Sequence, residues 1–484
     1  MEEGQVLTTV APALSAVLEE QNDRYAASPA REANLRALRE GAAAIVTGQQ
    51  TGLFLGPLFT LYKAATAIRV ARARSAVPVF WLQTEDHDLA EIAATSVPRA
   101  QGGPLRLSLP APPEPVSVAH RRLPEAVGAL HGQLAEALAA FPRAAPHLER
   151  LARHYRPGSS WSEAFAGTLA DLFAEDGLVL LDPRDPALAP LAAPVHRRAL
   201  HGWREVAEIL HASEAQETVH VRDDSPLSFF HPDGPEGRRC RLRVVDGRFQ
   251  EIGGASTHAL DDLLRVLGDE PLRFSTSALL RPILQDVWLP GAVYVGGPAE
   301  VRYFEQLGPL HDWFGLPRPE VLPRASFTIL EEGDRKRLAR TGVPLEEVAQ
   351  PVEEILARVR GKSPAGERAA SSLLQAFDRA LADLAPTLRD AGERAEHAAE
   401  KTRGTVARAV EKLAENVDAA WRLRDRALVE DVTRLRERLF PEGAPQERIY
   451  GPSYFLARHG ERAFLERIVD AALPEGGGRR SLPL

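Results

Sequence analysis

The segment between residues 43 and 82 constrains the fold more than any other part of the chain. Ala43 to Val46 forms a short apolar run, and Val77 to Leu82 (VPVFWL) forms a longer one. The residues between them carry an apolar stripe at helical spacing, with Pro57 placed for a first turn. Two buried strands joined by a helix are typical of a parallel sheet. The sequence therefore predicts an α/β core built on such a sheet.

Later segments repeat this alternation of strands and helices, with two interruptions. An apolar run at 178–181 and the run AVYVGG, which is followed by Pro298 at a helix start, add further strands. The pair Asp246-Gly247 between two alternating runs predicts a β-hairpin. We therefore predict a core over 1–100 (with a helical lead-in), 161–215 and 258–335, insertions at 101–160 and 216–257, a helical arm at 336–440 and a helical end at 441–484.

The arm has the pattern of a coiled coil. It is dense in Ala, Leu, Arg and Glu, and between Val406 and Leu439 apolar residues recur at steps of four and three. Two long helices would pair with each other or across a dimer, with the chain reversal near Arg403-Gly404 or at Pro386. A plain amphipathic bundle is the alternative.

Composition excludes several classes of protein. The formal net charge of −8 argues against binding to a nucleic-acid backbone, which needs a clustered excess of Lys and Arg. The single cysteine, Cys240, excludes an internal disulfide and a thiolate zinc cluster. No apolar run reaches the roughly 20 residues of a membrane helix, and the acidic start does not resemble a secretory signal. We expect a cytoplasmic protein that contacts neither nucleic acid nor membrane.

Two glycine-containing loops follow predicted strands and precede helices that begin with proline. In an open α/β sheet, ligands bind beyond the carboxyl ends of the strands, where helix N-termini present free backbone N–H groups. Either loop could hold a phosphate or a carboxylate, and the alternative is that the glycines only form tight turns. The candidate binding residues are Thr47, Gly48, Gln49 and Gln50 in the first loop and Gly296 and Gly297 in the second.

A polar cluster directly follows the apolar strand at 77–82. Glu85, Asp86 and His87 stand at its end, where polar residues have few structural reasons to gather. His87 could act as a general base toward an amine, and Glu85 or Asp86 could hold Mg²⁺ or a substrate ammonium. Asp88 with Glu91 matches a capping box, so we interpret Asp88 as a helix cap.

Several blocks together resemble a known family. The runs VTGQQTGLFLGPLFTLYKAATAIRVA, VPVFWLQTEDHDLAEI, FSTSALLRPILQDVWLP, AVYVGGPAEVRYFEQL and ERIYGPSYFLARHG are similar, in this order and over essentially the whole chain, to the cysteine ligases of bacillithiol biosynthesis, the BshC family. The resemblance implies a Rossmann-like core related to nucleotidylyltransferases and class I synthetases, two insertions, and a C-terminal coiled coil that forms a homodimer.

The resemblance also implies a reaction. It is the joining of the carboxyl group of cysteine to the amino group of glucosaminyl malate, the last step in making bacillithiol. A carboxylate must be activated before it condenses with an amine, so ATP and Mg²⁺ are expected. His87 would act as the base, and Arg281 and Gln285 would clamp the malate carboxylates, because a guanidinium matches a carboxylate with two hydrogen bonds.

The resemblance further implies that ADP binds near the C-terminal region and the coiled coil. The matching residues are Tyr450, Tyr454 and Phe455, whose rings could stack on a base or pack in the core. Two other functions stay open from the sequence. One is a nucleotidyl- or aminoacyl-transfer enzyme, although the chain lacks HIGH- and KMSKS-type motifs, and the other is a non-catalytic coiled-coil scaffold.

Overall fold

The computed structural model describes residues 12–99, 103–213, 218–359, 365–424, 426–473 and 478–484. These residues form two compact units. The first unit holds most of residues 1–327 together with 447–482, and the second holds residues 328–446. The start of the helical lead-in that we predicted from Gln5 lies outside the described residues.

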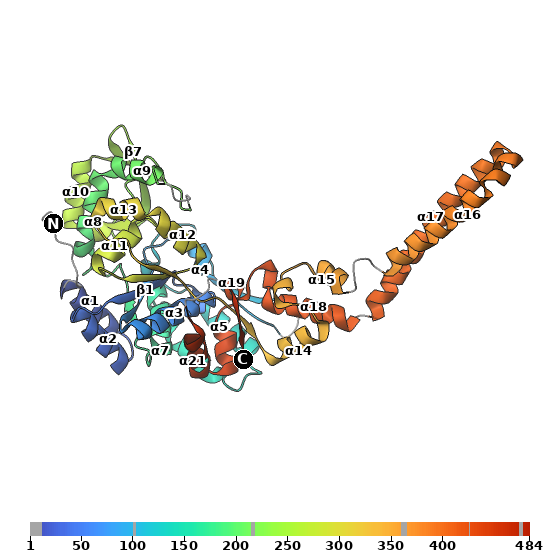
Figure 1. Ribbon diagram of the computed structural model, residues 1–484. Coiled ribbons are helices and arrows are strands. Elements are labelled where there is room, and N and C mark those ends of the chain that lie inside the picture. Colours follow the sequence, from blue (N-terminus) through green and yellow to red (C-terminus); the bar gives the residue numbers. More distant parts are fainter. Residues whose placement is uncertain (1–11, 100–102, 214–217, 360–364, 425, 474–477) are drawn as a thin grey trace. The chain divides into compact units, whose positions relative to one another are not determined.

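A parallel sheet of five strands forms the centre of the first unit, as predicted (Figure 1). The strand predicted over VPVFWL is found at the predicted residues, 77–82. In spatial order the strands are β12 (Val321–Pro323), β11 (Val293–Gly296), β1 (Ala44–Gln49), β2 (Val77–Leu82) and β5 (Val179–Leu181).

Helices cover both faces of this sheet, because alternate residues of each strand point to opposite sides. Val46, Val79 and Trp81 face one apolar cluster, while Ile45 and Val295 face another. The first cluster is formed with α1 (Pro12–Asp23), α2 (Pro29–Arg39), α8 (Ala189–His201), α11 (Leu280–Trp288) and α13 (Gly308–Phe314). The opposite face packs against α3 (Phe59–Arg74) and α7 (Trp161–Leu172), with α21 (Glu461–Ala471) beyond them.

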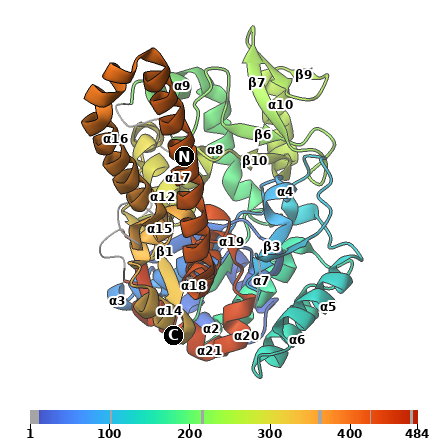
Figure 2. The same ribbon diagram turned by 90° about the vertical axis from the view of Figure 1, so that its right-hand side faces the viewer.

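The predicted insertions contain separate small structures. In the first, β4 (Leu105–Ser108) precedes α5 (Val127–Leu138) and α6 (Ala144–His154), and it forms a hairpin with β3 (Ala94–Val97), which lies before the predicted start of the insertion. The Asp246-Gly247 turn is confirmed, with both residues at positive φ, as a tight hairpin turn requires. This turn belongs to a five-stranded antiparallel sheet, which lies beside α10 (Leu260–Asp269) at the upper right of Figure 2. In spatial order its strands are β10 (Phe274–Thr276), β6 (Ser228–Phe230), β7 (Cys240–Val245), β8 (Arg248–Glu251) and β9 (Thr257–His258).

The second unit is helical and contains the predicted coiled coil. Its long helices α16 (Ala365–Ala391) and α17 (Glu393–Arg424) pair within the chain, with the shorter α14 (Glu332–Thr341), α15 (Val352–Val359) and α18 (Arg426–Leu439) in the same unit. The chain reverses at Gly392, whose φ of 92° favours glycine. Both predicted reversal points were wrong, because Pro386 lies inside α16 and Gly404 inside α17.

The C-terminal segment contains α19 (Gln446–Ile449), α20 (Ser453–His459), α21 and a short strand, β14 (Arg480–Pro483). Arg480 in this strand donates a backbone hydrogen bond to the Ser326 carbonyl oxygen in the first unit.

Candidate active site

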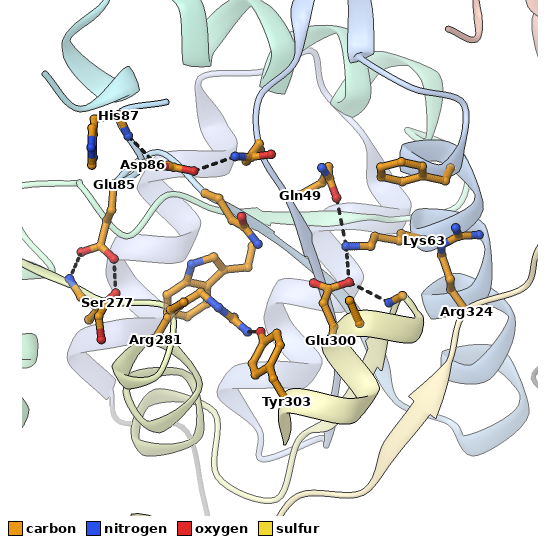
Figure 3. Close-up of a pocket in the computed structure, with 18 of the residues that line it drawn as sticks. Gln49, Lys63, Glu85, Asp86, His87, Ser277, Arg281, Glu300, Tyr303 and Arg324 are labelled. Atoms are coloured by element: carbon orange, nitrogen blue, oxygen red, sulfur yellow. Dashed lines mark hydrogen bonds and ion pairs between the residues drawn. The ribbon is translucent and has the colours of Figure 1, made fainter. Parts of the chain in front are cut away.

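The carboxyl ends of β1, β2 and β11 border a cavity of about 540 Å³ (Figure 3). These ends lie at one edge because the strands are parallel and in register, with Gln49 opposite Leu82. Half of the fourteen predicted site residues are brought together there. Those that line the cavity are Gln49, Gln50, Glu85, Asp86, His87, Arg281 and Gly297.

Glu85 and Asp86 form an acidic side of the cavity. The Glu85 carboxylate accepts hydrogen bonds from the backbone N–H and the hydroxyl group of Thr276, at the end of β10. The Asp86 carboxylate accepts from Gln50 Nε2 at 2.6 Å and from the His87 backbone N–H at 2.7 Å. Although burial opposes it, these hydrogen bonds and the charge of Arg239 lower the pKa of Asp86 below its usual range. Asp86 therefore stays negatively charged.

His87 is held by a residue that sequence reasoning missed. Arg239, from the second insertion, places Nη1 at 2.8 Å from Nδ1 of His87, and its guanidinium stacks on the ring of Phe229 at 3.7 Å. A guanidinium can only donate, so Nδ1 accepts and the neutral imidazole carries its proton on Nε2. Burial and the charge of Arg239 lower the pKa of His87. An Nε2–H group donates rather than accepts, so this geometry supports a donor role and not the predicted role of a base.

Arg281 is a buried cation that lines the same cavity. Its guanidinium donates to Gln285 Oε1 and to the hydroxyl group of Tyr303, both at 3.0 Å, and it lies over the ring of Tyr294. Gln285 does not line the cavity, because it lies on the same helix one turn behind Arg281 and is fully buried. Its contact with Arg281 makes it a positioning residue instead of the second clamp that we predicted.

A buried ion pair joins the two glycine loops. Lys63 Nζ lies 2.5 Å from Glu300 Oε2, 2.7 Å from the Gly48 carbonyl oxygen and 3.0 Å from Gln49 Oε1. Glu300, on α12 (Pro298–Gln306), also accepts from the Gly297 backbone N–H. Burial lowers the pKa of Lys63, while Lys63 lowers that of Glu300. Both residues were missed, although Lys63 is the only lysine before Lys336 in an arginine-rich chain.

Two further arginines line the cavity, Arg324 and Arg448. Arg324 forms a buried pair with Glu447 at 2.8 Å, and its Nε atom has no hydrogen-bond partner among the residues that the structure describes. A Cβ atom built on Gly297 would lie 3.8 Å from this Nε, so the glycine leaves the guanidinium open toward the start of α12. No local motif in the sequence marks either arginine.

The remaining predicted loop residues hold together the strands that border the cavity and do not line it themselves. The Thr47 hydroxyl donates to the Val295 carbonyl oxygen at 2.8 Å, across the β1–β11 pair. Gly48 allows close strand contact, because a Cβ there would lie 2.8 Å from the Trp81 carbonyl oxygen. Neither these two residues nor Gly296 lines the cavity.

The predicted nucleotide-stacking residues are buried. Tyr454 packs edge-on against Phe141 and Phe455, Phe455 stacks on Phe464, and Tyr450 is 2% exposed. These contacts give the three rings a packing role and leave no open face for a base in this conformation.

Metal ligands and a reactive thiol were also considered in the sequence. Within the described ranges no group of three or more His, Cys, Asp or Glu side chains could hold a metal ion. Asp88 accepts from the Glu91 backbone N–H at 3.2 Å, as expected for the cap of α4 (Leu89–Ile92).

Cys240 is buried, and burial raises the pKa of its thiol, which makes it a packing residue. A search of the described helices finds none with the length and apolarity needed to cross a membrane.

Comparison with known proteins places these features in a family. Residues 3–325 match the family model "Bacillithiol biosynthesis BshC, N-terminal Rossmann-like domain", and residues 327–478 match "Bacillithiol biosynthesis BshC, C-terminal coiled-coil domain".

Curated relatives carry the name "Putative cysteine ligase BshC". The protein from Koribacter versatilis is 34% identical over 471 residues, which cover 93% of this chain and 86% of the relative. The protein from Solibacter usitatus is 32% identical over 484 residues (93% and 85%), and that from Salinibacter ruber is 31% identical over 461 residues (92% and 84%). With both domain models matched in order and relatives aligned over nearly the whole chain, this protein belongs to the BshC family of bacillithiol biosynthesis.

Proposed function

We propose that the protein is an amide ligase that joins the carboxyl group of cysteine to the amino group of glucosaminyl malate in the cytoplasm. Its family and the name of its relatives support a cysteine ligase of bacillithiol biosynthesis. The cavity at the edge of the sheet supports the same reaction, because both cationic and acidic side chains line it and its substrates carry both charges.

The observation that carries the proposal is the state of Arg281. Its side chain is 7% exposed, it lines the cavity, and its guanidinium donates to two neutral oxygens. It makes no ion pair with a carboxylate of the described residues. Glu300 and Asp286 act on this charge without forming an ion pair with it, so an anionic ligand bound directly to the guanidinium would supply the missing partner. A malate carboxylate fits the fork of the guanidinium.

The acidic wall would receive the amino group. Glu85 and Asp86 are held by neighbouring donors and line the same cavity as Arg281 (Figure 3). Asp86 stays charged because its pKa is lowered. A substrate ammonium would gain a charge-assisted hydrogen bond there before it gives up its proton and attacks the carbonyl carbon.

His87 would stabilise the oxygen on which negative charge develops. With Nδ1 held by Arg239, the Nε2–H group is the donor that remains for a ligand. Fixed donors aimed at a developing oxyanion lower the barrier of acyl transfer. Replacement by glutamine, which keeps an N–H donor, should retain more activity than replacement by alanine. A base role would instead make the two variants equally inactive.

Carboxylate activation needs a nucleotide, and one corner of the cavity fits its phosphates. Arg324 has a buried Nε without a partner among the described residues, and Arg448 lies on the same wall. ATP bound there would supply the phosphoryl or adenylyl group that activates the cysteine carboxylate. The described carboxylates do not form a cage for Mg²⁺ by themselves, and we derive no step through that ion.

Mass spectrometry of a reaction mixture tests the function. Purified protein with cysteine, glucosaminyl malate and ATP should form the amide product together with ADP or AMP, and the nucleotide product identifies the activation route. Arg281→Met should lower kcat/KM at least 100-fold, because it removes the buried cation. Arg265→Met, at an exposed arginine on α10, is the matched control. No product with any nucleotide would refute the proposal.

The coiled coil would join two copies of the chain. Leu373, Leu384 and Leu413 on the α16–α17 hairpin are about half exposed, which is unusual for large apolar side chains. Light scattering of the full chain should give a dimer, and Leu384→Glu should shift the mass toward the monomer. An unchanged mass in that variant would exclude this surface as the interface.

A further inference from the structure

A second cavity, of about 650 Å³, lies in the first unit beyond the ends of β2 and β5. Its walls come from the end of α1, the start of α7, the loop after β5 and a loop of the second insertion. None of the roles assigned above uses its residues. The side chains that decide its chemistry are Tyr25, Arg156, Ser160, Glu163, Asp182 and Arg184.

Asp182 is a half-buried carboxylate in this wall. Its Oδ1 atom accepts from the Thr84 hydroxyl at 2.5 Å and from the Arg184 backbone N–H at 2.9 Å. Its Oδ2 atom receives no hydrogen bond from the described residues. The nearby Arg184 guanidinium is committed elsewhere, since it donates to the carbonyl oxygens of Leu272, Phe274 and Pro235. Asp182 thus has an open acceptor, and although the charge of Arg184 acts on it, no described residue forms an ion pair with it.

Two other acceptors are open in the same cavity. The Tyr25 hydroxyl forms no hydrogen bond with the described residues, and burial together with the Asp182 charge raises its pKa. The Glu163 carboxylate is also unpaired there, while its backbone N–H donates to Ser160 Oγ at the start of α7. Three oxygen acceptors around one space favour a ligand that brings several N–H donors, such as a primary ammonium group.

The exposed rim of the cavity also carries a cation. Arg156 is exposed, and its guanidinium has no partner among the described residues. The Ser159 hydroxyl donates to the backbone carbonyl oxygens of His154 and Arg156, and the Ser160 hydroxyl contacts Ser162 Oγ, so the Arg156 guanidinium is the donor available there. A guanidinium is a usual partner of a carboxylate, so this rim can hold one.

We propose that this second cavity binds a small free α-amino acid, with its ammonium group on Asp182 and the Tyr25 hydroxyl and its carboxylate toward Arg156. The inference does not depend on the ligase function. It does predict that the two cavities are structurally linked, because Thr84 and Glu85, which are consecutive residues after β2, contact residues that line different cavities. Thr84 holds Asp182, and Glu85 holds Thr276.

Calorimetric titration of the full chain tests the proposal. L-Serine is the probe, and L-lactate, which has a hydroxyl group in place of the ammonium, is the matched ligand control. L-Serine should bind and L-lactate should not. Asp182→Asn should weaken binding of L-serine at least tenfold, since it removes a charge-assisted hydrogen bond. Tyr25→Phe should weaken it severalfold and serves as the second variant if Asp182→Asn does not fold.

Two control variants separate this site from the first cavity. Glu208→Gln, at an exposed position on α9 (Trp203–His211), and His87→Ala should both leave L-serine binding unchanged. Absence of L-serine binding by the wild-type chain would overturn the proposal. Binding that is lost in His87→Ala and retained in Asp182→Asn would do so as well, since it would place the amino acid in the first cavity. Neither result would bear on formation of the amide product.

Discussion

Replacement of Lys63 by methionine tests the contribution of the buried ion pair between Lys63 and Glu300. Lys63 is 3% exposed and contacts three acceptors, of which the Glu300 carboxylate is charged. Methionine keeps most of the apolar stem and removes the ammonium group. Glu300 would then retain only the Tyr294 hydroxyl and the Gly297 backbone N–H as donors.

The expected loss of stability is large. Removal of one partner from a buried ion pair typically costs about 3–5 kcal/mol, because the other charge stays buried without compensation. At a urea slope of about 3 kcal/mol per M, this loss corresponds to a fall in the unfolding midpoint of about 1–1.7 M. An exposed pair gives far less, since solvent screens it.

The pH dependence provides an independent check. In the wild-type protein Lys63 holds the pKa of Glu300 below its unfolded value, so this contribution is present above that value and is lost as pH falls through the folded pKa. In the variant, burial without the cation raises the folded pKa of Glu300 above its unfolded value. Protonation then favours the folded state, and the stability difference between the two proteins should shrink from pH 7 to pH 5.

Urea titration followed by tryptophan fluorescence measures both effects. Five of the six tryptophans, Trp81, Trp161, Trp203, Trp288 and Trp313, belong to the first unit, so the signal reports its unfolding. Lys336→Met is the control, because Lys336 pairs with Glu332 on an exposed helix face and should leave the transition unchanged. A Lys63→Met midpoint equal to that of the control, or a loss that is the same at pH 5 and pH 7, would refute the reasoning.

Three further predictions concern other contacts. Gly48→Ala should lower the free energy of unfolding by about 1–3 kcal/mol in the same titration, because its Cβ would meet the Trp81 carbonyl oxygen at 2.8 Å, and an unchanged midpoint would contradict this. Arg239→Met should raise the pKa of His87 toward its ordinary value in an NMR titration of the imidazole, since a nearby positive charge is removed; a pKa that does not move would show that burial alone sets it. Glu461→Gln should lower the free energy of unfolding by about 1.5–3 kcal/mol at pH 7. Residues of α6 lower the pKa of Glu461 to about 2, so this difference should diminish from pH 5 downward as the carboxylate is protonated. Equal stability of the two proteins at pH 7 would exclude a stabilising pair.

The core and the edge that bears the cavity could be predicted because their signals are local. Apolar runs of strand length end in polar residues at Gln49 and Gln83, and parallel strands bring such ends together. The coiled coil was predicted from its spacing, but its reversal was misplaced. A proline was taken as a break at Pro386, whereas the structure accommodates it within α16 and turns at Gly392.

The partners of the predicted residues could not be found in this way. Arg239 lies 152 residues from His87 and reaches it only through the fold of the second insertion. Whether the imidazole donates or accepts depends on that contact, so the role of His87 could not be read from the run Glu85-Asp86-His87. Gln285 was predicted to clamp a carboxylate together with Arg281 because both stand in the block LLRPILQD, but it lies one helical turn behind the arginine.

Under the role proposed for His87, its contact with Arg239 makes the second insertion part of the catalytic apparatus. Cleavage or truncation in that insertion would leave every strand of the parallel sheet in place and still free the imidazole to exchange its tautomers. A loss of turnover with an intact sheet would then indicate damage in the second insertion. The core transplanted without this insertion would fold but would not catalyse the reaction.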